Sequence, residues 1–563
     1  MEAYDQLWEN IREQHNEDDV ALAERAVKWV LCAFEPPKSD ILLEAMRYSL
    51  EGDDLVQKEK RSEEDILLLC QDLLTIDAER RIWMLPHASV AEYFESRHMT
   101  LAKCDVFASL TSLNFLLKSE FQSSHMEHKS ENFDTFEGYI SHTWPRHVQR
   151  YDEWLGSRDG ANPDPTLVTT LKGFLGSVEE SGNCYRKWLK KLEGRIVHTE
   201  LTPEDMTLFV MCRYGFYYIL RDWWEGGKIN EELVLTECRL HPGYNSVALA
   251  ARGRCLPMCR YLVGIIGLNN PLAKGHCRAM EQAIEGGSQD IVSFFVQEAS
   301  VDVNICYGYE TAAQYASRSY RTDMLQWLVD QGWIDVHREG GTWFGNVLIA
   351  SANGDRVKSV EILLEAGAEV NATVECGDYG SALVAAASAW RGLDYIEKIQ
   401  LLLRHGADPN LPMKGGEYAN ALEAVVVSAF DRYYKRYRDE NIHALKLLLE
   451  AGADPAIIND HGQHGSALAA AACCGFKDLL KMMIDVTGKE RAIECLGQSR
   501  CPQELYVKDE EHIERWRQDK SDTIAYLTDE VGVENEILDR IGLRDVEPEI
   551  TGDGWMQFVF RYD

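Results

Sequence analysis

Apolar residues recur at helical spacing through most of this chain, which predicts a mainly α-helical protein. The first such helix covers residues 21–34, where one face carries Leu22, Ala26, Trp29, Val30 and Ala33. Pro36-Pro37 ends this helix, because proline lacks the backbone N–H that a helix needs. Ser39 is expected to cap the helix that follows.

The next segment predicts a small mixed domain. A third helix begins at Ser62, and two short strands at 74–76 and 81–85 then flank a polar turn. Ser89 and Glu92 have the spacing of a capping box that opens another helix. Three helices, a hairpin and a helix predict a winged-helix-like bundle over residues 1–100. A helical linker region is expected over residues 101–202.

Two phrases alternate in the C-terminal half. A helix-ending phrase with two leucines, then Gly-Ala and an acidic residue, occurs at 363–371, 402–410 and 448–455. A Gly/Ala-Ser/Asn phrase that ends in Leu occurs at 345–348, 380–383, 419–422 and 465–468. Gly367, Gly406 and Gly452 are 39 and 46 residues apart. This spacing indicates a repeated two-helix unit whose extra length falls between its two helices.

Each phrase has a physical interpretation. The Ser or Asn caps a short alanine-rich helix, whose small side chains let a neighbouring helix approach closely. The second helix carries leucines and ends at glycine, which tolerates the left-handed conformation of a helix stop. A single unit cannot bury its own apolar face, so the units must stack.

These units resemble ankyrin repeats, although their spacing exceeds the roughly 33 residues of the ideal unit. The resemblance implies an ankyrin-repeat solenoid over residues 203–486, preceded by the winged-helix-like helical bundle. We expect about eight units, with degenerate copies at the N-terminal end. A charged helical cap or tail is expected over 487–563, where the region around Arg515-Trp516-Arg517 covers the end of the stack.

Four further phrases resemble the stretch that follows the nucleotide-binding module in fungal NACHT–ankyrin proteins, which are NLR-like signal-transducing ATPases. They lie at 29–33, 69–74, 87–94 and 144–147. The phosphate-binding loop of such ATPases is missing, because Gly227-Lys228 is followed by Ile229 and Gly488-Lys489 by Glu490. The ATPase activity of the family is therefore not expected of this chain.

Composition narrows the choice of partners and compartment. The 563 residues include 58 Lys and Arg against 92 Asp and Glu, a net charge of −34. Such a surface repels phosphate backbones and anionic membranes, so no direct nucleic-acid or membrane partner is expected. No apolar run is long enough to span a bilayer. Fifteen scattered cysteines, several in apolar helices, are typical of a reducing compartment, the cytoplasm or nucleus.

Possible chemical sites have simpler structural interpretations. His87 beside Ser89 could relay a proton, but a helix cap explains the serine better. His125 and His128 lack partners at metal-ligand spacing, and so do Cys238, Cys255 and Cys259. No nucleophile elbow or dinucleotide-binding glycine loop is present. The sequence predicts no enzyme, no cofactor and no metal site.

One insertion stands out as a candidate partner-binding site. It combines four cations and four aromatics within nine residues of an acidic chain: Phe430, Asp431, Arg432, Tyr433, Tyr434, Lys435, Arg436, Tyr437 and Arg438. Aromatic and arginine side chains are enriched at binding hot spots. The insertion is expected to contact an acidic partner. The alternative is a helical extension whose tyrosines pack on the preceding helix while the cations stay solvated.

Two functions remain open from the sequence. In the first, the chain is a non-enzymatic adaptor or regulator, including a co-regulator of transcription, that binds proteins on its ankyrin array. In the second, it is the C-terminal part of an NLR-like signal-transducing ATPase whose nucleotide-binding module is missing from this chain. The identity of the partner does not follow from the fold.

Overall fold

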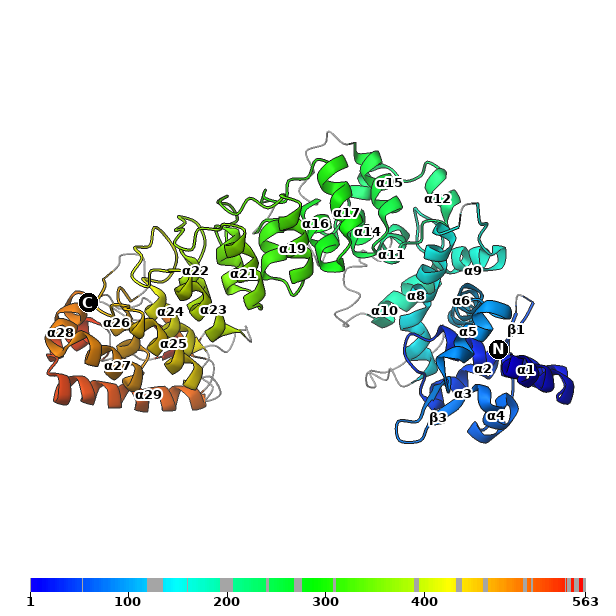
Figure 1. Cartoon of the computed structure of the whole chain (residues 1–563), viewed down its shortest axis with the longest axis horizontal. Coiled ribbons are helices and arrows are strands. Elements are labelled where there is room, and N and C mark those ends of the chain that lie inside the picture. The colour runs from blue at the N-terminus through cyan, green and yellow to red at the C-terminus, as the bar shows by residue number, and fades with distance from the viewer. Residues whose placement is uncertain are drawn as a thin grey trace. The chain divides into compact units, whose positions relative to one another are not determined.

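The structure is a computed structural model that divides into two compact units, residues 1–282 and 283–563 (Figure 1). The boundary falls inside helix α16 (His276–Gly286). The described residues are 2–52, 54–118, 135–158, 160–192, 206–238, 243–267, 276–306, 310–388, 394–431, 438–458, 464–499, 504–507, 510–541, 543, 548–550 and 556–559. Within these residues, no helix has the length and apolar character that crossing a membrane requires.

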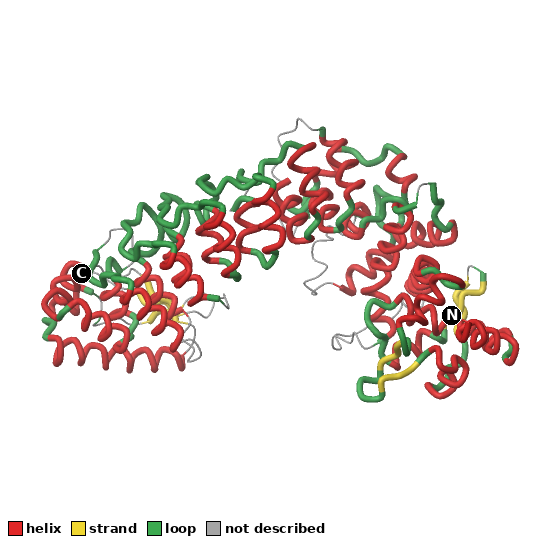
Figure 2. The backbone as a smooth tube through the Cα atoms, in the orientation of Figure 1, coloured by secondary structure: helices red, strands yellow, loops and turns green. Residues whose placement is uncertain are grey.

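The first unit begins with helices and two small hairpins (Figure 2). Its elements are α1 (Glu2–Gln14), α2 (Glu17–Cys32), α3 (Ser39–Ala45), β1 (Tyr48–Glu51), β2 (Asp54–Gln57), α4 (Glu63–Cys70), η1 (Gln71–Leu73), β3 (Thr75–Asp77), β4 (Ile82–Met84) and α5 (Ala88–Arg97). The predicted hairpin is present as antiparallel β3 and β4. Helix α1 and the β1–β2 hairpin were not expected, and the winged-helix assignment stays a prediction.

Two predicted helix caps are wrong. Lys38 is the N-cap residue of α3, and the Ser39 hydroxyl accepts a hydrogen bond from Trp83 Nε1 at 3.1 Å. His87 is the N-cap residue of α5, where its Nδ1 accepts from the Ser89 backbone N–H at 3.1 Å. The Ser89 hydroxyl instead lies 2.8 Å from the hydroxyl of Tyr4 and 2.8 Å from His87 Nδ1. In both cases the serine hydroxyl that was expected to cap a helix is hydrogen-bonded to a residue distant in sequence.

The rest of the first unit is helical. It contains α6 (Leu101–Leu117), α8 (Phe136–Gly156), α9 (Pro165–Leu175), α10 (Asn183–Leu192), α11 (Thr207–Tyr214), α12 (Arg221–Glu225), α13 (Glu231–Leu235), α14 (Ser246–Arg252) and α15 (Leu256–Ile266). Helices α6 and α8 pack together, and α11 packs on α14. This last contact places the predicted first repeat helix beside the next one.

Helix α8 shows what the 144–147 phrase does. Pro145 lies inside the helix and has no N–H to donate to the carbonyl of Ser141. Trp188 Nε1 of α10 donates to that carbonyl instead, at 3.0 Å. The ring of Trp188 also packs against that of Trp144, with ring centroids 5.3 Å apart. The proline therefore frees an acceptor that ties α10 to α8.

A buried polar group completes this packing. Asp105 of α6 accepts from Arg150 Nε at 2.6 Å and lies 2.8 Å from His147 Nδ1. Arg150 also donates to the carbonyl of Cys32 at 2.6 Å, which anchors the end of α2. Burial lowers the pKa of His147, although the neighbouring carboxylate opposes this shift. The group joins three helices and shows no opening to a substrate.

The second unit continues the pattern of helix pairs. Its helices are α17 (Gln289–Ser293) with the π-helical turn η3 (Phe294–Glu298), α18 (Ala312–Arg318), α19 (Thr322–Asp330), α20 (Val347–Asn353), α21 (Val357–Glu365), α22 (Ala382–Ser388), α23 (Tyr395–Arg404), α24 (Ala421–Asp431), α25 (Arg438–Glu450), α26 (Ala467–Cys473) and α27 (Lys477–Thr487). First helices pack on first helices along the series from α18 to α26. Second helices pack in the same way from α19 to α27.

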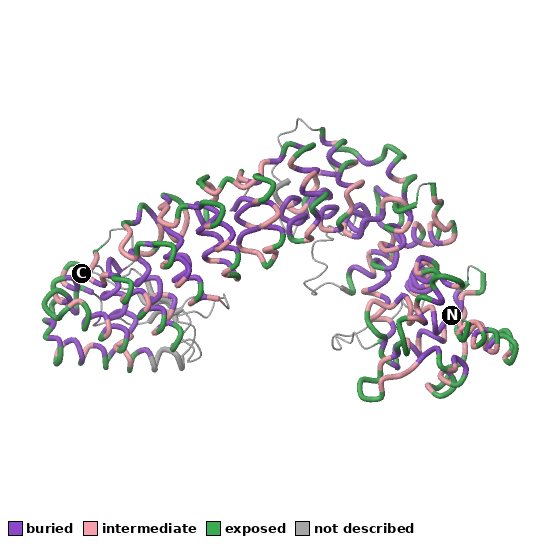
Figure 3. The backbone as a smooth tube through the Cα atoms, viewed as in Figure 1, coloured by how far each residue is buried: buried purple, intermediate pink, exposed green. Residues whose placement is uncertain are grey.

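Local chemistry in these pairs is as the sequence predicts. Asn346 caps α20 by accepting from the Ile349 N–H at 2.8 Å, and Ser466 caps α26. Gly367, Gly406 and Gly452 have φ of 94°, 84° and 89°, the left-handed region that ends the second helices. The alanine-rich first helices are buried along their length, as the purple segments of Figure 3 show.

The end of the array is covered by the C-terminal elements. These are α28 (Lys489–Gln498), β5 (Glu504–Val507), α29 (Glu510–Ala525), η5 (Tyr526–Val531), α30 (Asn535–Arg540), β6 (Pro548–Ile550) and β7 (Met556–Val559). Helix α29 packs on α26 and α27, and its Trp516 is buried. The strands form one antiparallel sheet in the order β5-β7-β6. The assignment of residues 487–563 as a cap or tail stays a prediction.

Candidate partner-binding surface

The four loops that join successive pairs from α19 to α26 have the same length. They run over 331–346, 366–381, 405–420 and 451–466, and Figure 2 shows such loops gathered along one edge of the array. Because these loops do not vary, the unequal spacing of Gly367, Gly406 and Gly452 arises within the helix–turn–helix part of each unit. This agrees with the predicted position of the extra length.

An asparagine ladder links neighbouring loops. Asn371 donates through Nδ2 to the Gly406 carbonyl at 3.0 Å and accepts from the Asp408 N–H at 2.8 Å. Asn410 makes the same pair of bonds to the next loop, both at 2.8 Å. Asn304 does so with the loop that begins after α19. Each asparagine uses donor and acceptor together, which fixes the register between units.

An aromatic ladder runs parallel to it. The ring of Phe344 stacks on that of Tyr379 at 5.9 Å, and Tyr379 stacks on Tyr418 at 6.4 Å. His464 occupies the equivalent place in the next loop, where its Nδ1 lies 3.2 Å from the buried carboxylate of Glu423. The loop backbones also approach closely, since Asp378 N–H donates to Trp343 O at 2.9 Å and Glu417 N–H to Asp378 O at 2.8 Å. The loops form one laterally bonded surface.

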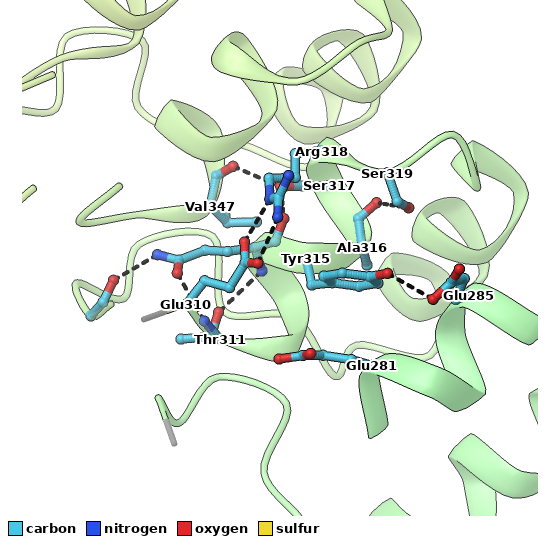
Figure 4. A network of polar contacts seen from close by, with 12 residues as sticks. Glu281, Glu285, Glu310, Thr311, Tyr315, Ala316, Ser317, Arg318, Ser319 and Val347 are labelled. Carbon is cyan, nitrogen blue, oxygen red and sulfur yellow. Dashed lines mark hydrogen bonds and ion pairs between the residues drawn. The ribbon is translucent and has the colours of Figure 1, made fainter. Parts of the chain in front are cut away.

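Helix α18 carries the polar network drawn in Figure 4. The buried Glu310 carboxylate accepts two bonds from Arg318, at 2.7 and 2.8 Å. Gln314 Nε2 donates to the Gly340 carbonyl at 2.6 Å, and Ser317 bonds to the first residue of α20 at 3.2 Å. These side chains form hydrogen bonds with one another and with the next unit. At the other side of α18, the Tyr315 hydroxyl donates to the exposed carboxylate of Glu285 at 3.0 Å.

The opposite ends of the helices carry a different set of side chains. Tyr320 and Arg321 form the turn between α18 and α19, and Arg356 lies in the turn between α20 and α21. The ring of Tyr320 is 64% exposed, and the Arg356 guanidinium carbon lies 5.2 Å from its centroid. The guanidinium of Arg321 lies against Gly287, where an added Cβ would meet Nη2 at 1.7 Å. Each arginine therefore lies over the preceding turn.

The predicted partner-binding residues fall between α24 and α25. Phe430 belongs to α24 and Arg438 begins α25. The other members, Arg432, Tyr433, Tyr434, Lys435, Arg436 and Tyr437, lie outside the described residues. Sequence reasoning missed Tyr320 and Arg356, which take the same place in their own units. An arginine recurring immediately before the second helix was the signal that could have found them.

The other sequence candidates do not converge. His125 and His128 lie outside the described residues. Burial raises the pKa of Cys255 to about 12, which opposes the thiolate that a metal requires. Cys255 packs against Gly215, and Cys238 and Cys259 are buried. In the part of the chain that the structure describes, no three His, Cys, Asp or Glu residues are placed to hold a metal ion.

Comparison with known proteins identifies the repeats. The family model for ankyrin repeats, which comprises three copies, matches residues 282–374. Residues 282–374 are ankyrin repeats. The ankyrin repeat domain of Bcl-3, described as a unique member of the IκB protein family, is 23% identical over 40% of this chain and 92% of that one, with a TM-score of 0.30. No curated protein matches the chain.

Proposed function

We propose that this chain is a non-enzymatic adaptor or regulator that binds a protein partner on its ankyrin array. One form of this role is co-regulation of transcription, and the site of action is the cytoplasm or nucleus. The observation that supports it is a rigid array with large aromatic side chains left in solvent. Trp343 is 42% exposed and Tyr320 64% exposed, whereas Phe344 of the aromatic ladder is buried and Tyr379 and Tyr418 are half-buried. Exposed aromatics on a rigid support are typical of binding surfaces.

The basic insertion is part of this proposal. Its test replaces Arg432, Lys435, Arg436 and Arg438 by Glu in the full chain. Proteins that co-purify with the wild-type chain are identified, and binding is then measured between purified components. Loss of binding in the variant supports the role of the insertion, and unchanged binding contradicts it. Failure of every purified candidate to bind the wild-type chain contradicts the adaptor function itself.

A second candidate is the C-terminal part of an NLR-like ATPase. It is favoured by the resemblance of four phrases, one of which contains Pro145 and His147. Mapping the 5′ end of the transcript tests it, because an in-frame upstream phosphate-binding loop would support it. Micromolar nucleotide binding by the purified chain would contradict both proposals, since neither places a phosphate-binding loop in these residues.

A further inference from the structure

Two consecutive turns carry arginine where a helix normally begins with a small polar residue. Arg321 is the N-cap residue of α19 and Arg356 that of α21, and neither side chain caps its helix. Ser, Thr, Asp and Asn are preferred there because their oxygen accepts a backbone N–H. The positive end of the helix dipole also disfavours a cation. Breaks of local rules of this kind are expected at functional positions.

The turn between α18 and α19 also presents an aromatic ring in a fixed position. The neighbouring carboxylate of Asp355, in the next turn, raises the pKa of the Tyr320 hydroxyl. Arg356 lies over the ring and is itself exposed. Among the described residues, Arg356 has no ion-pair partner. The Arg356 guanidinium thus lies over the ring and remains accessible to solvent.

We propose that Tyr320, Arg321 and Arg356, here called the turn patch, bind an acidic segment of a protein partner. Asp323 pairs with Arg321 at 3.1 Å, whereas Arg356 forms no ion pair among the described residues, so Arg356 is the cation left for a ligand. Arginine recognises carboxylates through paired N–H donors. The chain has a net charge of −34, so most of its surface repels an acidic segment. Binding of such a segment is therefore confined to places where a cation such as Arg356 is exposed. This inference rests on the proposed adaptor function and names its partner chemistry.

An aromatic residue with arginine also occurs between the two helices of later units. Trp390 and Arg391 separate α22 from α23, and the segment 430–438 spans the corresponding place between α24 and α25. Residues 389–393 and 432–437 are outside the described set, so they contribute sequence only. An aromatic residue with arginine therefore occupies this place in three of four consecutive units, and the turn 354–356 of the remaining unit carries Arg356 without an aromatic residue. The site proposed here is limited to the turn patch.

The test measures binding of a short fluorescein-labelled peptide of alternating glutamate and aspartate to the full chain. Fluorescence anisotropy at low ionic strength gives the Kd. We expect Arg356→Glu and Tyr320→Ala each to weaken binding about tenfold or more, as at other hot spots. The matched control is Arg404→Glu, an exposed arginine at the far end of α23, which should leave the Kd unchanged. Glutamate at the start of α21 suits the helix dipole, so Arg356→Glu should fold normally.

Several results would overturn the inference. These are a Kd for Arg356→Glu equal to that of the wild type, an equal loss in Arg404→Glu, or tighter binding of single-stranded DNA than of the peptide. The adaptor function is tested separately with a co-purifying protein. If such a protein binds wild type and Arg356→Glu equally, the adaptor function stands and the turn patch fails. If no protein binds while the peptide still requires Arg356, the turn patch stands and the adaptor function fails.

Discussion

The asparagine ladder gives a quantitative prediction for Asn371→Ala. The side chain makes two bonds to the next unit, one to Gly406 and one from Asp408. A neutral hydrogen bond contributes about 0.5–1.5 kcal/mol net to stability. Both bonds are exposed, so water replaces the lost partner and the lower part of that range applies. We expect Asn371→Ala to cost about 1–2 kcal/mol, because stacked repeats depend on nearest-neighbour contacts. Asn371→Asp keeps the acceptor but loses the donor and should cost less.

Hydrogen exchange and urea denaturation can measure this loss. The N–H of Asp408 loses its acceptor in Asn371→Ala, so its exchange should accelerate by roughly 5- to 30-fold, the equivalent of 1–2 kcal/mol. Amides in α2, which belongs to the other compact unit, serve as the internal control and should keep their rates. Exchange of Asp408 at the wild-type rate, together with an unchanged urea midpoint, would show that the ladder does not stabilise the array.

Three further predictions concern the core. Tyr379→Leu should cost about 1–3 kcal/mol in urea denaturation, because it removes stacking on two neighbouring rings, whereas Tyr379→Phe should retain most of it. Trp188→Phe should cost about 1–3 kcal/mol by leaving the Ser141 carbonyl unpaired. Pro145→Ala restores a backbone N–H that can donate to the Ser141 carbonyl, so the cost of Trp188→Phe should be smaller when both substitutions are combined. Additive costs of the two substitutions in a double-mutant cycle would contradict this. Burial raises the pKa of Asp152 to about 8. The first unit should therefore lose stability as the pH rises from about 4 to 8, because the buried carboxyl group must then lose its proton. Thermal melts at several pH values should show a weaker pH dependence for Asp152→Asn.

Much of the repeat architecture follows from the sequence because its determinants are local. A capping Ser or Asn, a run of alanines, paired leucines and a terminal glycine lie within one unit, and Asn346 and Gly367 behave as their chemistry predicts. The same reasoning fails where a distant residue competes for the same group. Ser89 has the spacing of a cap, but its hydroxyl is hydrogen-bonded to Tyr4, which lies 85 residues away.

The candidate site was harder to predict for a related reason. Asn371 stands in a phrase that the sequence makes obvious, yet its bonds reach residues 35 and 37 positions away. Its role becomes visible only when two units stand side by side. The turn patch breaks the preference for small polar N-caps, so a search for favourable local patterns passes over Arg321 and Arg356. A search for recurring violations at equivalent positions would have found both.

The proposed binding residues lie at the ends of the helices opposite to the ladders that join the repeats. The loops 331–346, 366–381, 405–420 and 451–466 are equal in length, and bonds of the asparagine ladder and ring contacts of the aromatic ladder join neighbouring members. The turns at the other end of the helices are joined by different contacts, since the Val357 N–H donates to Asp394 Oδ2 at 3.0 Å and Lys398 Nζ donates to the Gly354 carbonyl at 2.5 Å. The extra residues of each unit accumulate on that side. Insertions there leave the register between units unchanged. This edge can therefore acquire arginine and aromatic residues without weakening the stack, which is where both the turn patch and the 430–438 insertion occur.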